Sequence, residues 1–107
     1  MDNSLSQSEF YILLSLAIKS SHGYEIMKQV ERDSEGKVSM GPGTLYGSIK
    51  RMLQSSLIEE VAGGHSRRKY YTLTDKGRKS LTFELQRYSD AVDLAKRKDL
   101  FKELGLA

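Results

Sequence analysis

Apolar residues fall at helical spacing in the first part of the chain. The segment 10–18 is apolar at almost every position, so its helix presents apolar side chains in nearly every direction. Ser6 and Glu9 precede it with the spacing of a capping box, in which a hydroxyl and a carboxylate satisfy amides of the first turn. Because the core of one domain covers one face of a helix, the pattern predicts that a second subunit covers another.

The next two helices are shorter and differ in character. A second helix begins near Gly23, after the break at residues 20–23, and its apolar side is formed by Ile26, Met27 and Val30. A third begins at Pro42, since proline suits the first position of a helix. Its packed face is predicted to be Leu45, Ile49, Met52 and Leu53. The opposite face has small, polar and basic residues, which are Gly43, Thr44, Gly47, Lys50, Arg51 and Gln54. Tyr46 and Ser48 lie at its two edges.

A hairpin and a long helix complete the pattern. Residues 57–62 and 67–73 read as strands, and residues 63–66 form the turn between them. Thr74 is predicted to be the N-cap of the last helix, whose apolar residues repeat at intervals of four and three before a break at Asp99. These residues are Leu81, Leu85, Tyr88, Val92 and Ala95. Such a repeat is typical of a helix that pairs with another helix.

The order helix, helix, helix, hairpin, helix is that of a winged helix-turn-helix. We therefore predict a mainly α fold with a small β-hairpin (α+β). The winged helix-turn-helix domain is expected over residues 1–75, with a long C-terminal dimerisation helix over residues 76–107 packed on the same domain. The length of 107 residues suits one domain. In this fold the third helix fits the major groove of DNA, whose width is similar to the diameter of a helix.

Positive charge is concentrated in the middle of the chain. Residues 42–79 hold eight basic and three acidic side chains, a net charge of +5, whereas the remainder carries −2. Such a segment indicates a surface for a polyanion, although a solvated charged face has the same composition. Gly47 favours the first interpretation, because glycine inside a helix costs about 1 kcal/mol relative to alanine and close approach of another surface would explain it.

The predicted DNA-binding residues lie on the third helix and on the wing. They are Gly43, Thr44, Tyr46, Gly47, Ser48, Lys50, Arg51, Arg67, Arg68 and Lys69. For Tyr46 two roles are equally supported, a hydrogen bond to a phosphate and packing against the second helix. Of Tyr70 and Tyr71, which alternate along a strand, one is expected to pack and the other to reach the surface.

Four segments together resemble the PadR family of bacterial transcriptional regulators. They are HGYEIMKQV (22–30), GPGTLYGSIKRM (41–52), SLIEE (56–60) and RRKYYTLTDKGR (67–78). The single C-terminal helix resembles the small subfamily. The resemblance implies a homodimer, formed by the last helix with help from the first, that represses transcription until a small molecule relieves the repression. Two-fold symmetry then predicts a pseudo-palindromic operator in double-stranded DNA.

The predicted dimer interface combines residues of the first and last helices. It comprises Phe10, Leu14, Leu81, Leu85, Tyr88, Val92 and Ala95. In drug-sensing members of the small subfamily, an aromatic residue of the last helix stacks on flat ligands. By resemblance, a small aromatic effector would bind at Tyr88 with Tyr11 nearby. Plain interface packing of Tyr88 is the alternative, and the absence of tryptophan favours it.

The sequence offers little for catalysis. It has no cysteine, and His22 and His65 are not spaced as metal ligands. Glu59 and Glu60 are strand neighbours that point to opposite faces, so they are no acid and base pair. We predict no enzymatic activity, no cofactor and no metal site. The amino terminus lacks a basic n-region and the apolar run is too short for a bilayer, so we expect a cytoplasmic protein without a membrane partner. The alternative function is a winged-helix adaptor or antirepressor that binds protein.

Overall fold

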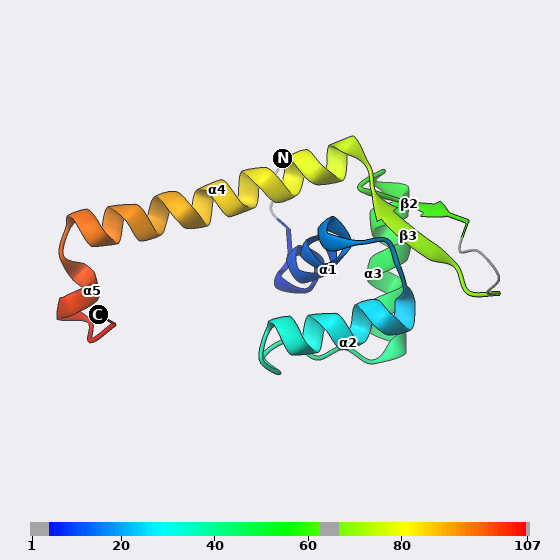
Figure 1. The fold of residues 1–107 in the computed structure, drawn as a ribbon, viewed down its shortest axis with the longest axis horizontal. Helices are drawn as coiled ribbons and strands as arrows, with labels where there is room; N and C mark the ends of the chain where they lie inside the picture. Colours follow the sequence, from blue (N-terminus) through cyan, green and yellow to red (C-terminus); the bar gives the residue numbers. More distant parts are fainter. Residues whose placement is uncertain (1–4, 63–66, 107) are drawn as a thin grey trace.

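The fold is a helical domain with a small sheet and one projecting helix (Figure 1). The computed structural model describes residues 5–62 and 67–106. In chain order, the elements are α1 (Gln7–Ile18), β1 (Ser21–His22), α2 (Gly23–Asp33), α3 (Pro42–Gln54), β2 (Ile58–Val61), β3 (Tyr70–Leu73), α4 (Asp75–Arg97) and α5 (Leu100–Glu103). This mainly helical architecture confirms the predicted fold class.

Helix α1 lies at the centre of the domain and contacts α2, α4 and β3. Its predicted capping box is confirmed. The Ser6 hydroxyl oxygen accepts a hydrogen bond from the Glu9 amide at 3.1 Å, and Glu9 Oε1 accepts one from the Ser6 amide at 2.9 Å. Ile12, Leu13 and Leu16 are buried in the core. Other elements of the same chain thus already cover α1 from several directions.

The apolar face of α3 is narrower than predicted. Leu45, Ile49 and Met52 are buried, whereas Leu53 is 36% exposed. At about 100° per residue, Leu53 lies roughly 80° from Leu45 around the helix, at the margin of the packed face. The prediction for Leu53 was therefore only partly right.

Three antiparallel strands form the sheet in the order β1-β3-β2. Ile58 pairs with Leu73 and Val61 with Tyr70, which confirms the predicted hairpin with shorter strands. The alternation of the two tyrosines is also confirmed, since Tyr71 is buried and Tyr70 half-buried. Strand β1 was not predicted, because two residues are too few to show a period. The predicted turn at residues 63–66 lies outside the described residues.

Helix α4 begins at the predicted N-cap, where Thr74 Oγ1 accepts a hydrogen bond from the Gly77 amide at 3.0 Å. Its first turns pack on the domain, and a Cβ at Gly77 would overlap the carbonyl group of Leu57. From Leu85 to Arg97 every side chain except the half-buried Ala95 is exposed. The helix therefore projects from the domain, and the extent of the molecule along this direction is 52 Å. Asp99 adopts a left-handed conformation and ends this stretch, as predicted.

Two residues of the predicted dimer interface belong instead to the core of this chain. Leu81 is 4% and Phe10 is 9% exposed, and both lie in the buried cluster. The reason is that the first turns of α4 pack on α1. The apolar repeat of α4 therefore contributes to the core of this chain at its beginning and is exposed further along the helix. The prediction that Leu81 and Phe10 are available to a second subunit is corrected accordingly, while Leu85, Tyr88 and Val92 remain exposed.

Candidate nucleic-acid interface

The outward face of α3 is open along its length. Thr44, Lys50 and Arg51 are exposed, as the sequence predicted. A Cβ added at Gly43 would meet nothing within 4 Å, and one added at Gly47 would meet only Arg51 Nη1 at 3.6 Å. Packing within the described part of the chain therefore does not explain why these two positions are occupied by glycine.

Ser48 does not belong to this face. It is 2% exposed, because it lies about 60° from Leu45 around the helix and falls within the packed stripe. The prediction that Ser48 contacts DNA is corrected. Its hydroxyl oxygen accepts a hydrogen bond from Arg51 Nη2 at 3.2 Å. Ser48 thus holds the Arg51 side chain along the helix.

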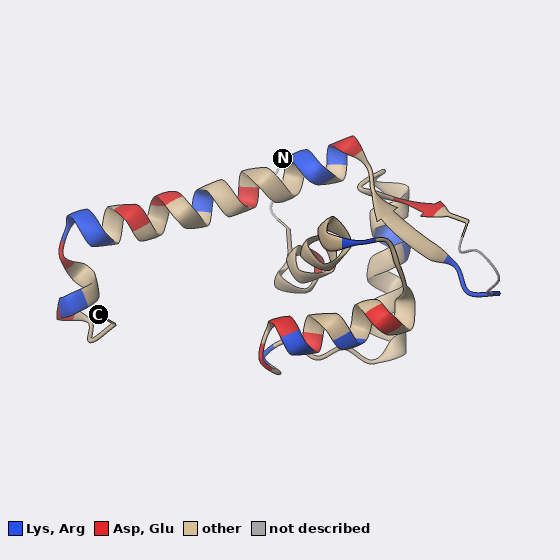
Figure 2. Ribbon diagram, viewed as in Figure 1, with Lys and Arg blue, Asp and Glu red and all other residues tan. Residues whose placement is uncertain are grey.

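The wing carries positive charge at the end of β3 that lies away from α4 (Figure 2). Arg67, Arg68 and Lys69 are exposed and precede the first residue of β3. The sequence pattern predicts that they belong to the strand, whereas in the structure they lie outside it. Glu59 and Glu60 are exposed on β2, so the two sides of the wing differ in charge (Figure 2).

Tyr46 packs against the beginning of α2. A Cβ at Gly23 would lie 2.5 Å from the Tyr46 hydroxyl oxygen and 2.8 Å from Cζ, so the ring occupies the space that a side chain would need. The tyrosine is nevertheless 49% exposed. Of the two roles left open for Tyr46, packing against the second helix is therefore present, and its exposed side still faces outward from α3.

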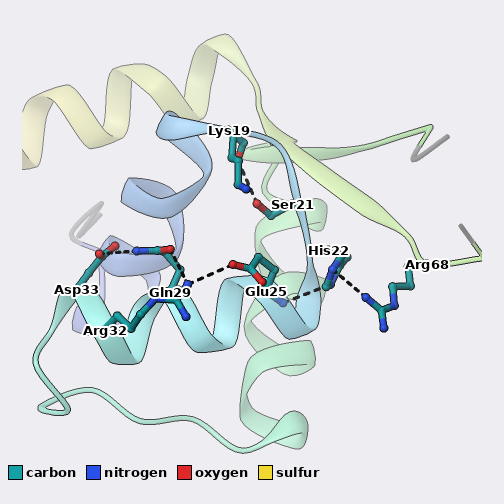
Figure 3. Close-up of polar contacts among 8 residues, drawn as sticks. All are labelled: Lys19, Ser21, His22, Glu25, Gln29, Arg32, Asp33 and Arg68. Carbon is teal, nitrogen blue, oxygen red and sulfur yellow. Dashed lines mark hydrogen bonds and ion pairs between the residues drawn. The ribbon is translucent and has the colours of Figure 1, made fainter.

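His22 joins the beginning of α2 to the wing, a role that sequence reasoning missed. Its Nδ1 accepts a hydrogen bond from the Glu25 amide at 3.2 Å and so caps α2. Its ring meets that of Tyr70 edge-on at 5.4 Å between centroids, and its Nε2 lies 3.0 Å from Arg68 Nη1 (Figure 3). Histidine is not among the favoured capping residues, so only the fold reveals this contact.

A shared hollow connects α3 with the wing. It has a volume of about 180 Å³ and is lined by residues of α2, α3 and the wing, among them Tyr46, Arg68 and Lys69. Tyr71 forms part of its wall, and burial, with smaller effects of Glu60 and Tyr46, raises the pKa of its phenol. Tyr46, at the edge of the outward face of α3, and the basic end of the wing therefore line the same hollow.

Other kinds of site find little support in residues 5–62 and 67–106. No group of three or more histidine, aspartate or glutamate side chains is placed there to hold a metal ion. No helix in the same residues is both long and apolar enough to cross a membrane. The site consists of a basic, groove-sized helix face and a basic wing.

The fold and this surface define a winged helix-turn-helix protein. Residues 12–83 match the transcriptional regulator PadR-like family, and the chain belongs to that family. This assignment confirms the resemblance seen in the sequence, and it supports the prediction that the chain is no enzyme, since members of the family are transcriptional regulators.

Similar proteins agree with this assignment. The chain is 35% identical over 68 residues to the transcriptional regulator YqjI of Escherichia coli K12, a match that covers 62% of this chain and 31% of YqjI. A PadR family transcription regulator from Clostridium difficile R20291 is similar in structure with a TM-score of 0.71 and 29% identity, over 86% of this chain and 97% of that one. The protein smu.1704 from Streptococcus mutans UA159 gives a TM-score of 0.70 and 26% identity, over 100% of this chain and 97% of its own. The chain thus spans about a third of its curated relative and nearly all of these two structures.

Proposed function

We propose that this protein is a homodimeric transcriptional regulator that binds double-stranded DNA sequence-specifically and acts as a repressor. The observation that carries the proposal is the shared hollow, because it brings Tyr46, at the edge of the outward face of α3, beside the wing cations Arg68 and Lys69. Helix α3 would enter the major groove, where Lys50 and Arg51 reach base edges or phosphates. The wing would place Arg67 to Lys69 on the neighbouring backbone or minor groove.

The dimer is supported by the projecting part of α4. Leu85, Tyr88 and Val92 are 42%, 48% and 41% exposed and share one face of the helix. An isolated helical segment is marginal in water, and most of the stability of a protein helix comes from packing its apolar face. A second copy of the same helix would supply that packing. Two recognition helices related by a two-fold axis then predict half-sites separated by about 34–36 Å, or a multiple of it.

Relief of repression by a small aromatic effector is the finer part of the proposal. Phe10 meets Tyr11 and Tyr88 edge-on, at 5.4 and 5.3 Å between ring centroids. An effector stacked on the exposed side of Tyr88 would lie at the dimer seam and next to this aromatic cluster. If planar aromatic compounds at high concentration change neither tyrosine fluorescence nor the thermal midpoint, this part of the proposal fails.

Selection from a random duplex library tests the proposed function directly. Bound duplexes are sequenced, and fluorescence anisotropy then gives the affinity of the selected duplex at several salt concentrations. We expect an enriched inverted repeat that is bound at least about 10³-fold more tightly than random DNA. Weak and unspecific binding without enrichment would instead favour the alternative of a protein-binding adaptor.

The wing is tested by removing two of its charges. In the Arg67→Ala, Arg68→Ala variant, binding to all sequences weakens, and the salt slope falls by about 0.9 for each phosphate that the wing no longer neutralises. The matched control is Lys96→Ala with Arg97→Ala, which removes the same charge from the exposed far end of α4. An equal change of slope in both variants would exclude a specific role for the wing.

A further inference from the structure

Helix α3 ends in a turn whose geometry is unusual for its sequence. Ser56, two residues after the end of the helix, has a left-handed backbone with a φ of 61°, and the Leu57 amide donates to the Met52 carbonyl at 2.9 Å. A left-handed residue beside such a hydrogen bond is typical of the Schellman motif, where that residue is usually glycine. Serine disfavours this conformation because it has a Cβ, so other contacts have to hold it in place.

The beginning of α4 supplies those contacts (Figure 1). The three carbonyl groups that follow α3 one after another all accept hydrogen bonds from Thr74 and Lys76. Lys76 Nζ donates to the Ser55 carbonyl at 2.7 Å. The Thr74 hydroxyl donates to the Ser56 carbonyl, and the Thr74 amide donates to the Leu57 carbonyl at 3.1 Å. The cation of Lys76 also lies at the negative end of the α3 dipole, where a positive charge is favourable.

Gly77 allows the two elements to come this close. A Cβ at this position would overlap the Leu57 carbonyl. The Gly77 amide donates to Thr74 Oγ1 at 3.0 Å, so the hydroxyl that caps α4 is the same one that donates to Ser56. We refer to residues 55–57 together with residues 74–77 as the joint. The joint fastens the end of the candidate recognition helix to the beginning of the candidate dimer helix.

The joint differs in kind from the other packing of α4. The first turns of α4 pack on α1 through the core, and apolar packing is non-directional. The hydrogen bonds of the joint depend on angle and distance. Those of Thr74 and Lys76 side chains are open to water, so each stabilises the fold only modestly. Their main effect is therefore on the direction of α3 relative to α4.

From this arrangement we propose that Thr74 and Lys76 are positioning residues that set which separation of DNA half-sites the dimer accepts. The inference rests on the proposed function, in which α4 joins the two subunits and α3 enters the major groove. Leu85, Tyr88 and Val92 then fix α4 relative to the two-fold axis, and the joint fixes α3 relative to α4. The separation of the two recognition helices follows from these two connections.

The length of α3 makes the joint a sensitive point. The helix has 13 residues and is therefore about 20 Å long. A tilt of about 10° at the joint moves its first residue by about 3 Å, which is close to the 3.4 Å between successive base pairs. The first residues of a recognition helix are the ones that contact base edges. A loosened joint would therefore let each α3 follow a half-site displaced by one base pair.

A pair of substitutions removes the two side-chain donors and leaves the cap in place. Thr74→Asp keeps the cap of α4, because aspartate is among the best N-cap residues, but its carboxylate cannot donate to the Ser56 carbonyl. Lys76→Met keeps an unbranched side chain without the ammonium group. Thr74→Ser with Lys76→Arg keeps both donors and is the conservative pair. Arg78→Met with Lys79→Met is the matched control, since it lowers the net charge by the same two units at exposed residues of the same helix.

The spacing of the half-sites is the readout. Duplexes carry the selected inverted repeat with one base pair inserted or removed at its centre, and fluorescence anisotropy gives the affinity of each protein for each duplex. We expect the wild type to lose roughly 5- to 150-fold for either change, as for a mismatched base pair. The Thr74→Asp, Lys76→Met variant should lose less than about threefold for the same change. The conservative pair and the charge control should keep the sharp preference of the wild type.

A preference that stays sharp would overturn the inference. If the Thr74→Asp, Lys76→Met variant discriminates between spacings as strongly as the wild type, the joint does not set the separation, although the protein still binds DNA as a dimer. Should thermal unfolding show that this variant does not fold, Lys76→Met alone carries the test, because a substitution at an exposed side chain changes stability little. An equal loss of preference in the charge control also contradicts the inference. A wild type that selects no inverted repeat overturns the proposed function itself, so the two failures are distinguishable.

Discussion

Replacing Gly47 by alanine tests whether DNA shapes the outward face of α3. In the free protein the added methyl group would lie 3.6 Å from Arg51 Nη1, an ordinary contact, with nothing else outside its own helix backbone within 4 Å. Alanine is favoured over glycine inside a helix by about 1 kcal/mol. The free energy of unfolding should therefore rise by about that amount, and the thermal midpoint by roughly 4–8 °C.

The same methyl group should weaken binding. If α3 lies in the major groove with Gly47 against DNA, the extra carbon overpacks the interface, which costs about 1–3 kcal/mol. Affinity for the selected duplex then falls roughly 5- to 150-fold. Thermal unfolding and anisotropy on one preparation measure both effects, and the gain in stability excludes misfolding as the cause of the weaker binding.

Two results would refute this reasoning about Gly47. A variant that gains stability and binds the duplex as tightly as the wild type would show that Gly47 lies away from DNA. A variant that loses stability would show that the space above Gly47 is filled in the folded protein. Gly43→Ala, where the space is also open, extends the test to the first turn of the same helix.

Three further predictions concern the stability of the fold and the formation of the dimer. Gly77→Ala should lower the free energy of unfolding by about 1–3 kcal/mol or more in chemical denaturation, because its Cβ meets the rigid carbonyl of Leu57. Leu85→Asp with Val92→Asp should give a monomer by light scattering that no longer binds the duplex; a tight-binding monomer would contradict the dimer. Because the pKa of Tyr71 is raised, the unfolded chain loses its phenol proton first, so stability should fall with increasing pH above about pH 10. Tyr71→Phe should make that fall smaller in denaturation curves at pH 9 to 11.

Periodic patterns were enough to predict most of the fold. The buried residues Leu45, Ile49 and Met52 follow from helical spacing alone, and the caps at Ser6 and Thr74 follow from local sequence. These features depend on residues three or four apart, so the chain itself encodes them. The same helical spacing predicted the exposed cations of α3.

Errors arose where one pattern serves two purposes. The apolar repeat of α4 runs without interruption through Leu81 and Leu85, yet Leu81 is buried in its own chain and Leu85 is exposed. Spacing cannot show where a helix leaves the domain, because that point depends on the length of α1, against which it packs. Ser48 shows a second kind of error. It is buried in the packed stripe of α3, but spacing alone does not distinguish a small polar residue inside the stripe from one at its edge.

The residues that sequence reasoning missed share one property, which is that their partners are distant along the chain. His22 meets Arg68, and Gly23 lies under Tyr46, so neither contact leaves a local pattern. Both lie where α2, α3 and the wing meet, and β1 pairs with β3 at the same place. The proposed binding of DNA by α3 and by the wing requires that the two keep a fixed relative position. The contacts invisible in the sequence are therefore the ones that link two separately predictable basic elements through the beginning of α2.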